Sequence, residues 1–508
     1  MNLLFLLLLT IISQAFSLNA LFLSFGAAGH SIPMFELAKA MKNHNVTFIT
    51  EAFAQSYINA EMCSNRSSFR LIFTNDSTDA IMEENKIQQD IIEYFMNHSL
   101  FGSLFYMIPT VGRITNALMH KAVHALMSDQ FDVIISSSLV LGAHALCQKA
   151  NTSCVIQRAE IILNIFDVNL PISCSLLSSK QITEFKYRIY NVAFYSHLII
   201  SIFKKLIESF YIIFQSFPQI PGPFYDTFTL RNLLFTQSNC LNLIGIPPTL
   251  YPPSYSHHLT KYLGGFIDES SIHHVDNDLT RWIKSKPMNS ILYVAFGSTD
   301  SASVILMFRG RNYNNYQIVF NEIQNVEHRR ILMDNQRVKV EHQFVQQKWI
   351  LQQNSVNLYL SHCGMGSTVE GIYFQKPMLC LPIHTDQFLN SMAIQNSGVG
   401  QSLFEPSYLL ESFLKPHDYH DYTFLASSVT TKLSTMWRNM TYEQAARLMS
   451  LEMKHAGGVK RAIEEIELLV SLNGDLSRYA PFHSTLPFYQ RYMLDLVCCK
   501  RGRKKKMD

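Results

Sequence analysis

Short apolar runs that end in a glycine-containing turn recur along this chain, and most are followed by a helix-like segment. Residues 21–25 (LFLSF) form the first run, the turn carries Gly26, Gly29 and His30, and a helical pattern covers 34–43 before a second apolar run at 46–50. A strand, a helix and a second strand in this order predict the start of a doubly wound α/β domain, in which helices cover a parallel sheet.

The same order returns in the second half of the chain. Apolar runs at 290–299, 356–360 and 378–381 predict buried strands, and apolar positions at helical spacing predict helices over 443–453 and 460–472. Between the halves, residues 242–268 are rich in Pro and Gly and interrupt the periodic pattern. We therefore expect a first domain over 18–241, a linker over 242–277 and a second domain over 278–470.

Length and composition agree with two packed domains. The chain has 508 residues, of which 48% are hydrophobic, so it can bury two cores. Its net charge of +3 carries no nucleic-acid signal, and we expect no nucleic-acid partner. The nine cysteines are scattered without metal-ligand spacing. They leave room for one or two disulfides in an oxidising compartment, without indicating a pairing.

The first residues have the pattern of a secretory signal peptide. Residues 2–13 are apolar, and Ala15 and Ser17 are the small residues expected before cleavage after Ser17, although no Lys or Arg precedes the apolar run. A buried first strand or a retained anchor is the alternative. Six glycosylation sequons follow, at Asn45, Asn65, Asn75, Asn97, Asn151 and Asn439. Together they predict a glycoprotein exposed to the lumen of the secretory pathway.

The candidate chemistry lies after the strand at 356–360. The turn 361–367 (SHCGMGS) leads into a helix-like segment, an arrangement that presents unpaired backbone N–H groups to a phosphate. His362 and Ser367 would lie beside these groups, and Glu370 would accept hydrogen bonds from ribose hydroxyls. After the next strand come Asp386 and Gln387. These residues predict a site for a nucleoside diphosphate that carries a hydroxyl-rich group.

The spacing H-x-G-x-x-S-x-x-E, followed by K-P-M, P and D-Q-x-x-N, resembles the signature of the UDP-glycosyltransferases. An ordinary Rossmann-type turn that binds another ligand is the alternative. The resemblance implies the GT-B arrangement, two Rossmann-like doubly wound α/β domains that face each other across a cleft. It also implies that the second domain binds the UDP-sugar, that the first binds the acceptor, and that a segment over 471–499 crosses back to the first domain before a basic tail at 500–508.

The resemblance assigns roles to individual residues of the second domain. Phe344 and Gln347, where the family has Trp and Gln, would meet the uracil, and Glu370 would bind the ribose. Asp386 and Gln387 would bind the sugar hydroxyls. The diphosphate would be held, without a metal or any cofactor besides the UDP-sugar, by Ser298, His362, Gly364, Gly366 and Ser367.

In the first domain, the resemblance makes His30 the general base that takes a proton from the acceptor hydroxyl. The implied reaction is inverting transfer of a hexosyl group, glucuronate or glucose, to a small lipophilic acceptor. The family's acid partner of this histidine falls on Ser137 when Phe131-Asp132 is aligned, and Asp132 lies at the opposite end of that strand. A serine does not stabilise an imidazolium as a carboxylate does. A catalytically silent protein that binds a sugar nucleotide or a lipophile is therefore the alternative.

Partners and location are expectations of the same kind. Residues 60–125 are expected to contribute to an apolar acceptor pocket or to ordinary core. The charge-free run 189–203 is too short to span a bilayer, and we favour a buried helix over one lying at a membrane surface. The family's spanning helix is missing before the basic tail. We expect the endoplasmic reticulum lumen, with contact to its membrane, and association with itself or with related transferases.

Overall fold

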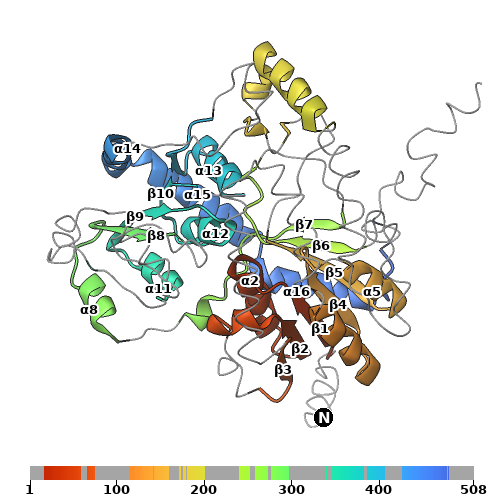
Figure 1. The fold of residues 1–508 in the computed structure, drawn as a ribbon. Coiled ribbons are helices and arrows are strands. Elements are labelled where there is room, and N and C mark those ends of the chain that lie inside the picture. Colours follow the sequence, from red (N-terminus) through yellow and green to blue (C-terminus); the bar gives the residue numbers. More distant parts are fainter. Residues whose placement is uncertain are drawn as a thin grey trace, which may run out of the picture.

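A seven-stranded parallel sheet forms the first half of the molecule (Figure 1). The computed structural model describes residues 17–58, 66–74, 115, 117–140, 142–159, 171–172, 175–178, 180–198, 200, 240–251, 258–272, 276–296, 339, 345–382, 386–406, 426–476 and 479. The strand order is β3-β2-β1-β4-β5-β6-β7. The strands are β1 (Asn19–Ser24), β2 (Asn45–Thr50), β3 (Phe69–Phe73), β4 (Val133–Ser137), β5 (Ser153–Arg158), β6 (Leu241–Ile244) and β7 (Thr260–Tyr262).

Both faces of this sheet are covered, which explains its continuous apolar strands. One face packs against helix α2 (Ala28–Ala40) and helix α16 (Gly458–Ser471), whose side chains join Phe22, Phe48 and Ile135 in one core cluster. The other face packs against α5 (Ala143–Lys149) and the helical residues 117–128. The predicted strand–helix–strand start of the chain is confirmed by β1, α2 and β2.

The second sheet has four described strands, all parallel, in the order β11-β10-β9-β8. They are β8 (Ile291–Ala295), β9 (Val356–Ser361), β10 (Met378–Cys380) and β11 (Gly400–Ser402). The helices of this half are α8 (Asp278–Lys284), α11 (Gln347–Gln352), α12 (Met365–Tyr373), α13 (Gln387–Asn396), α14 (Ala426–Arg438) and α15 (Thr441–His455). Apolar clusters lie on both faces of this sheet as well.

The stretch expected to be a linker contributes two strands to the first sheet. β6 begins at Leu241, β7 covers Thr260–Tyr262, and both lie within or next to residues 242–277. These strands have four and three residues, and the Pro and Gly residues between them obscured their pattern. Gly264 shows why this stretch needs glycine. Its φ is +75°, and a Cβ there would collide with the carbonyl of Met453.

The return to the first half also begins earlier than the expected 471–499. Helix α16 already lies on the first sheet, where Ala462, Ile466 and Leu469 are buried among the side chains of β1, β2 and β4. The amide of Gly458 donates to the carbonyl of Leu263 at 2.7 Å, which fixes the point where the chain crosses. Residues 480–508 lie outside the described part of the chain.

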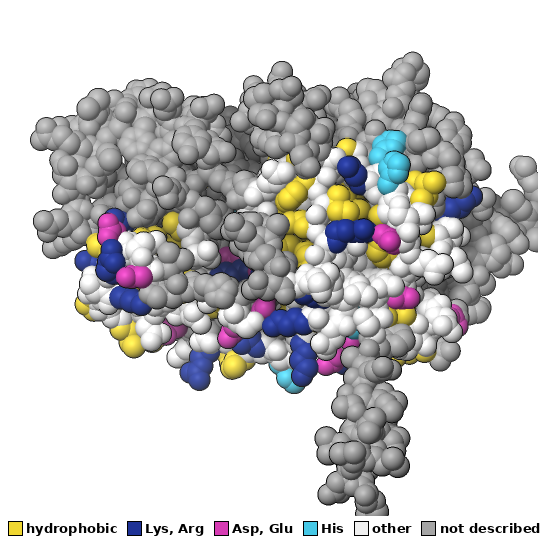
Figure 2. Space-filling view, turned by 90° about the horizontal axis from the view of Figure 1, so that it is seen from below, with side chains coloured by type: hydrophobic (Ala, Val, Ile, Leu, Met, Phe, Trp, Pro, Cys, Tyr) yellow, Lys and Arg dark blue, Asp and Glu magenta, His cyan; other side chains and the backbone are white. Residues whose placement is uncertain are grey.

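Residues 189–198 of the charge-free run belong to a helix over 185–198 that has one buried face. Tyr190, Phe194 and Leu198 pack in a small cluster of their own, whereas Phe185 and Ile189 are exposed. Of the helices that the structure describes, none has both the length and the apolar character needed to cross a membrane. The surface seen from below carries acidic and basic side chains in neighbouring positions, with apolar side chains between them (Figure 2).

Candidate functional site

The turn between β9 and α12 presents a helix N-terminus at the end of a buried strand. β9 ends at Ser361, His362 and Cys363 form the turn, and Gly364 is the residue before the helix. The N–H groups of the first turn of a helix have no partner within the helix and carry partial positive charge. A Cβ added at Gly364 would lie 2.5 Å from His362 Nε2, so only glycine lets the histidine ring lie over this turn.

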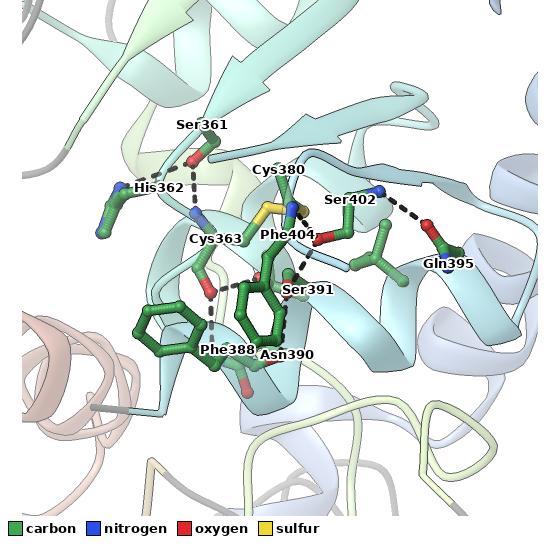
Figure 3. Close-up of a disulfide and its surroundings, with 12 residues drawn as sticks. Ser361, His362, Cys363, Cys380, Phe388, Asn390, Ser391, Gln395, Ser402 and Phe404 are labelled. Carbon is green, nitrogen blue, oxygen red and sulfur yellow. Dashed lines mark hydrogen bonds between the residues drawn. A yellow bond between two sulfur atoms is a disulfide. The ribbon is translucent and has the colours of Figure 1, made fainter. Parts of the chain in front are cut away.

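A disulfide that sequence reasoning did not pair joins this turn to the next strand (Figure 3). Cys363 is bonded to Cys380, the last residue of β10, and both are fully buried. The backbone of Cys363 has a φ of +56°, a left-handed conformation that residues with a Cβ rarely adopt. Its N–H donates to Ser361 Oγ at 3.1 Å. The β9–α12 turn is therefore covalently tied to the interior of the sheet.

Asn390 of helix α13 connects this turn to the predicted sugar-binding residues. Its side-chain amide donates to the carbonyl of Cys363 at 2.9 Å and to Asp386 Oδ2 at 2.8 Å, and its carbonyl oxygen accepts from the Tyr251 hydroxyl. Burial and the negative charge of Asp386 raise the pKa of Tyr251 well above its usual value. Gln387, the first residue of α13, is buried beside them.

Tyr251 could not be identified from the sequence because it lies 139 residues from Asn390, whose place in the D-Q-x-x-N pattern was visible. The hydroxyl and the amide meet only once the segment that follows β6 has packed against α13. Asn390 itself was part of the resemblance, but its offset alone gave it no role.

The side chains of Gln347 and Glu370, both in the second half of the molecule, are hydrogen-bonded to each other. Gln347 Nε2 donates to Glu370 Oε2 at 2.6 Å, and Gln347 Oε1 accepts from the hydroxyls of Tyr293 and Tyr359 at 3.3 and 3.2 Å. Gln347 is almost fully buried, so its side chain orients Glu370 in this structure. Its predicted contact with a base edge stays a prediction. Phe344 and Ser298 lie outside the described residues.

His30 lies in the first turn of helix α2, at the carboxyl ends of the first sheet. Its Nδ1 is 3.5 Å from Ser137 Oγ, at the end of β4. The sequence therefore placed Ser137 correctly against this histidine. Asp132 is indeed at the other end of the strand, where its Oδ2 accepts from the N–H of Asn19 at 2.7 Å. Phe25 packs edge-on against the His30 ring, with the ring centroids 5.8 Å apart.

Ser137 belongs to a buried polar row that crosses four strands. Ser24 pairs with Thr50, Ser137 pairs with Gln157, and the pairing of Leu23 with Ser136 brings Ser24 beside Ser137. All four polar side chains are fully buried on the face that α2 covers. Among the residues that the structure describes, Thr50 Oγ1 and both amide atoms of Gln157 have no hydrogen-bond partner. Of this row, Ser137 places its hydroxyl beside His30, where a carboxylate was expected.

The two halves of the site are held together through helix α2. This helix packs against α12, which begins at the β9–α12 turn (Figure 1). Lys348 of α11 donates to Glu36 Oε1 at 2.8 Å, and Lys39 lies 3.1 Å from the same oxygen. The structure thus packs α2, which carries His30 in its first turn, against α12, and Gly364, Gly366, Ser367 and Glu370 lie on or next to α12.

Comparison with known proteins gives partial matches in sequence, and no family model matches the chain. The uncharacterized UDP-glucosyltransferase YojK of Bacillus subtilis is 26% identical over 34% of this chain and 42% of its own length. The putative UDP-glucuronosyltransferase ugt-50 of Caenorhabditis elegans is 28% identical over 25% of this chain and 22% of its own length. The chain thus spans less than half the length of these curated relatives. Their names confirm the resemblance to UDP-glycosyltransferases.

Solved structures match over nearly the whole chain. Arabidopsis thaliana UGT89C1 complexed with UDP-L-rhamnose has a TM-score of 0.55 at 15% identity, covering 90% of this chain and 99% of that chain. The calicheamicin glycosyltransferase CalG4 has a TM-score of 0.52 at 12% identity, with 90% of this chain and 99% of that chain covered. At these identities the likeness concerns the fold, and the predicted GT-B arrangement is confirmed.

Proposed function

We propose that this chain, whose matched relatives are named UDP-glycosyltransferases, transfers a hexosyl group from a UDP-sugar to a hydroxyl of a small lipophilic acceptor. One observation carries the proposal: the predicted donor site and the predicted base lie on two helices that pack against each other. The β9–α12 turn offers a helix N-terminus beside His362, and α2, which carries His30, packs against α12.

The donor would bind by its diphosphate at this turn. The backbone N–H groups of Gly366 and Ser367 and the imidazole of His362 offset the negative charge, with Ser298 as a further proposed contact. This arrangement needs no metal ion or other cofactor. Glu370, held by Gln347, faces the ribose, and Asp386 and Gln387 bind the sugar hydroxyls. Phe344 completes the base site by stacking on the uracil.

The chemical step is a direct displacement at the anomeric carbon. His30 accepts the proton of the acceptor hydroxyl as that oxygen bonds to the anomeric carbon, and UDP leaves with the electron pair of the broken carbon–oxygen bond. One displacement inverts the anomeric centre. The hydroxyl of Ser137 is the hydrogen-bond partner that orients His30 Nδ1. Glucuronate and glucose are the sugars we propose.

An oxidising compartment is part of the proposal. The buried Cys363–Cys380 disulfide supports it, because disulfides persist in the secretory pathway and are rare in the cytosol. We place the protein in the endoplasmic reticulum lumen, in contact with the membrane surface and with itself or related transferases.

The test is release of UDP from UDP-glucose and from UDP-glucuronate in the presence of a panel of phenols and sterols. Wild type and His30→Ala are compared, and binding of UDP alone is measured in parallel by calorimetry. UDP release that depends on acceptor and is lost in His30→Ala supports the transferase. Failure of wild type to bind UDP overturns the proposal.

A second candidate, a silent sugar-nucleotide-binding protein, is favoured by one observation. His30 has a serine hydroxyl at 3.5 Å where a carboxylate would stabilise its charged form. Wild type that binds UDP but releases none with any acceptor, while Ser137→Asp gains turnover, identifies this candidate. Turnover by wild type excludes it.

A further inference from the structure

We propose that the Cys363–Cys380 disulfide holds Cys363 of the proposed phosphate-facing turn in its left-handed conformation, so that the bonded chain binds UDP more tightly than an unbonded chain with a Cβ at position 363. The proposal rests on the proposed function of the β9–α12 turn as the diphosphate site. It assigns to two cysteines a role in donor binding although neither sulfur faces the donor site, since both residues are fully buried.

The backbone of Cys363 has an uncommon conformation. Its φ of +56° lies in the left-handed region, which glycine enters freely and residues with a Cβ enter rarely. The residue stands between His362, whose ring lies over the turn, and Gly364, which precedes helix α12. A return of Cys363 to an ordinary conformation would therefore turn the His362 ring and the first N–H groups of α12 away from each other.

The disulfide attaches the turn to the end of strand β10. Cys380 is the last residue of β10 and pairs in register with Ser361, the last residue of β9. Cys363 is two residues beyond Ser361, so the disulfide fastens the turn to the neighbouring strand just after the two strands separate (Figure 3). The anchor is rigid, because Cys380 lies in the core of the second half.

Two hydrogen bonds also hold the backbone carbonyl of Cys363. The Cys363 carbonyl accepts from Asn390 Nδ2 at 2.9 Å and from Thr368 Oγ1 at 3.3 Å. Asn390 also holds Asp386, a proposed sugar contact. These bonds place the carbonyl, and the disulfide holds the side chain, so the Cys363 residue is fixed from both sides. Loss of the disulfide removes the only covalent restraint among them.

A purely stabilising cross-link is the competing explanation, and two double variants separate the two roles. Cys363→Ala with Cys380→Ala removes the bond and leaves a Cβ at position 363. Cys363→Gly with Cys380→Ala removes the same bond but allows the left-handed conformation. Both lose the same cross-link, so their thermal midpoints both fall, and only the backbone preference at position 363 differs between them.

The measurement is the dissociation constant of UDP by calorimetry, at a temperature where circular dichroism shows every variant folded. We expect the alanine variant to bind UDP about tenfold more weakly than wild type, and the glycine variant to recover most of that loss. Cys147→Ala, which removes a buried free thiol in the first half, is the matched control and should bind UDP as wild type does.

Equal UDP binding by wild type and both double variants would show that the disulfide only stabilises the fold, and would overturn the inference while leaving the proposed function standing. Equally weak binding by the two double variants would overturn it as well, since the left-handed conformation would then not be what the bond provides. Absence of UDP binding in wild type would overturn the proposed function, and the inference with it.

Discussion

Lys348 Nζ lies 2.8 Å from Glu36 Oε1, and this ion pair joins helix α11 of the second half to helix α2 of the first. The two side chains are mostly buried, with exposed fractions of 17% and 7%. Lys348 follows Gln347, which orients Glu370, and Glu36 is in the same helix as His30. The pair therefore connects the residues proposed for the donor with the residue proposed as base.

Replacement of Lys348 by Met should loosen this connection. We expect the free energy of unfolding to fall by about 2 kcal/mol, because Glu36 keeps Lys39 as a partner but loses a charged hydrogen bond. Turnover should fall more than UDP affinity, since α2 carries the base and α12 keeps its own N-terminus. Denaturant unfolding, turnover and UDP calorimetry measure the three effects. Lys432→Met, which removes a Lys–Glu contact within the second half and a hydrogen bond to the Ser402 carbonyl, is the control.

The same pair predicts a loss of stability in acid. Burial alone would raise the pKa of Glu36, but the charges and hydrogen bonds of Lys348 and Lys39 outweigh it and hold the pKa below its usual value. A lowered pKa in the folded state stabilises the fold above the pKa of the unfolded chain, and this stabilisation is lost as the pH falls through the folded value.

We therefore expect the thermal midpoint of wild type to drop below about pH 4.5, the usual range of a glutamate. The thermal midpoint of Glu36→Gln should be lower than that of wild type at neutral pH. It should also fall by less than that of wild type when the pH is lowered. Parallel curves for the two proteins between pH 6 and pH 3 would show that Glu36 contributes nothing to the acid response.

Ser137→Asp should strengthen His30 as a base. A carboxylate at this position would stabilise the imidazolium and fix the tautomer, and we expect turnover to rise about tenfold or more. The lower limb of the pH–rate profile should also move to higher pH, since the charged imidazole becomes more stable. Asp132→Asn, at the far end of the same strand, should leave that profile unchanged. An unaltered profile in Ser137→Asp would contradict the assignment of His30 as base.

Gln347→Leu tests the support of Glu370. The variant removes the amide that donates to Glu370 and leaves the hydroxyls of Tyr293 and Tyr359 without their acceptor. We expect UDP to bind about tenfold more weakly, and stability to fall by about 2 kcal/mol because buried polar groups lose their partners. UDP calorimetry and denaturant unfolding provide both numbers. A variant that loses stability while UDP binding is unchanged would remove Glu370 from the donor site.

Local spacing predicted much of this molecule. The residues from His362 to Glu370 lie in one turn and in the helix that follows it. Their relative positions therefore follow from the local sequence. The contact of His30 with Ser137 followed from the resemblance, because the alignment puts Ser137 where the family has the acid partner of this histidine. Lys348 and Glu36 are 312 residues apart, and Cys363 and Cys380 are joined across two strands. Such contacts depend on packing between elements, which no short pattern records.

The strands β6 and β7 illustrate the same limit for the fold. Their four and three residues are too few to show a period, and the prolines and glycines around them resemble a linker. Their place in the first sheet is decided by the pairing of β6 with β5 and of β7 with β6, and by the close approach of α15 to Gly264.

The return of α16 to the first sheet has a consequence for how the protein is made. Ala462, Ile466 and Leu469 complete a core whose other members lie mostly between Leu18 and Phe266. During synthesis the ribosome adds these three residues long after β1, β2 and β4. The apolar side chains that α16 covers in the folded protein therefore stay exposed while the rest of the chain is translated. Chaperones that bind apolar surface should therefore stay on this nascent chain until α16 emerges.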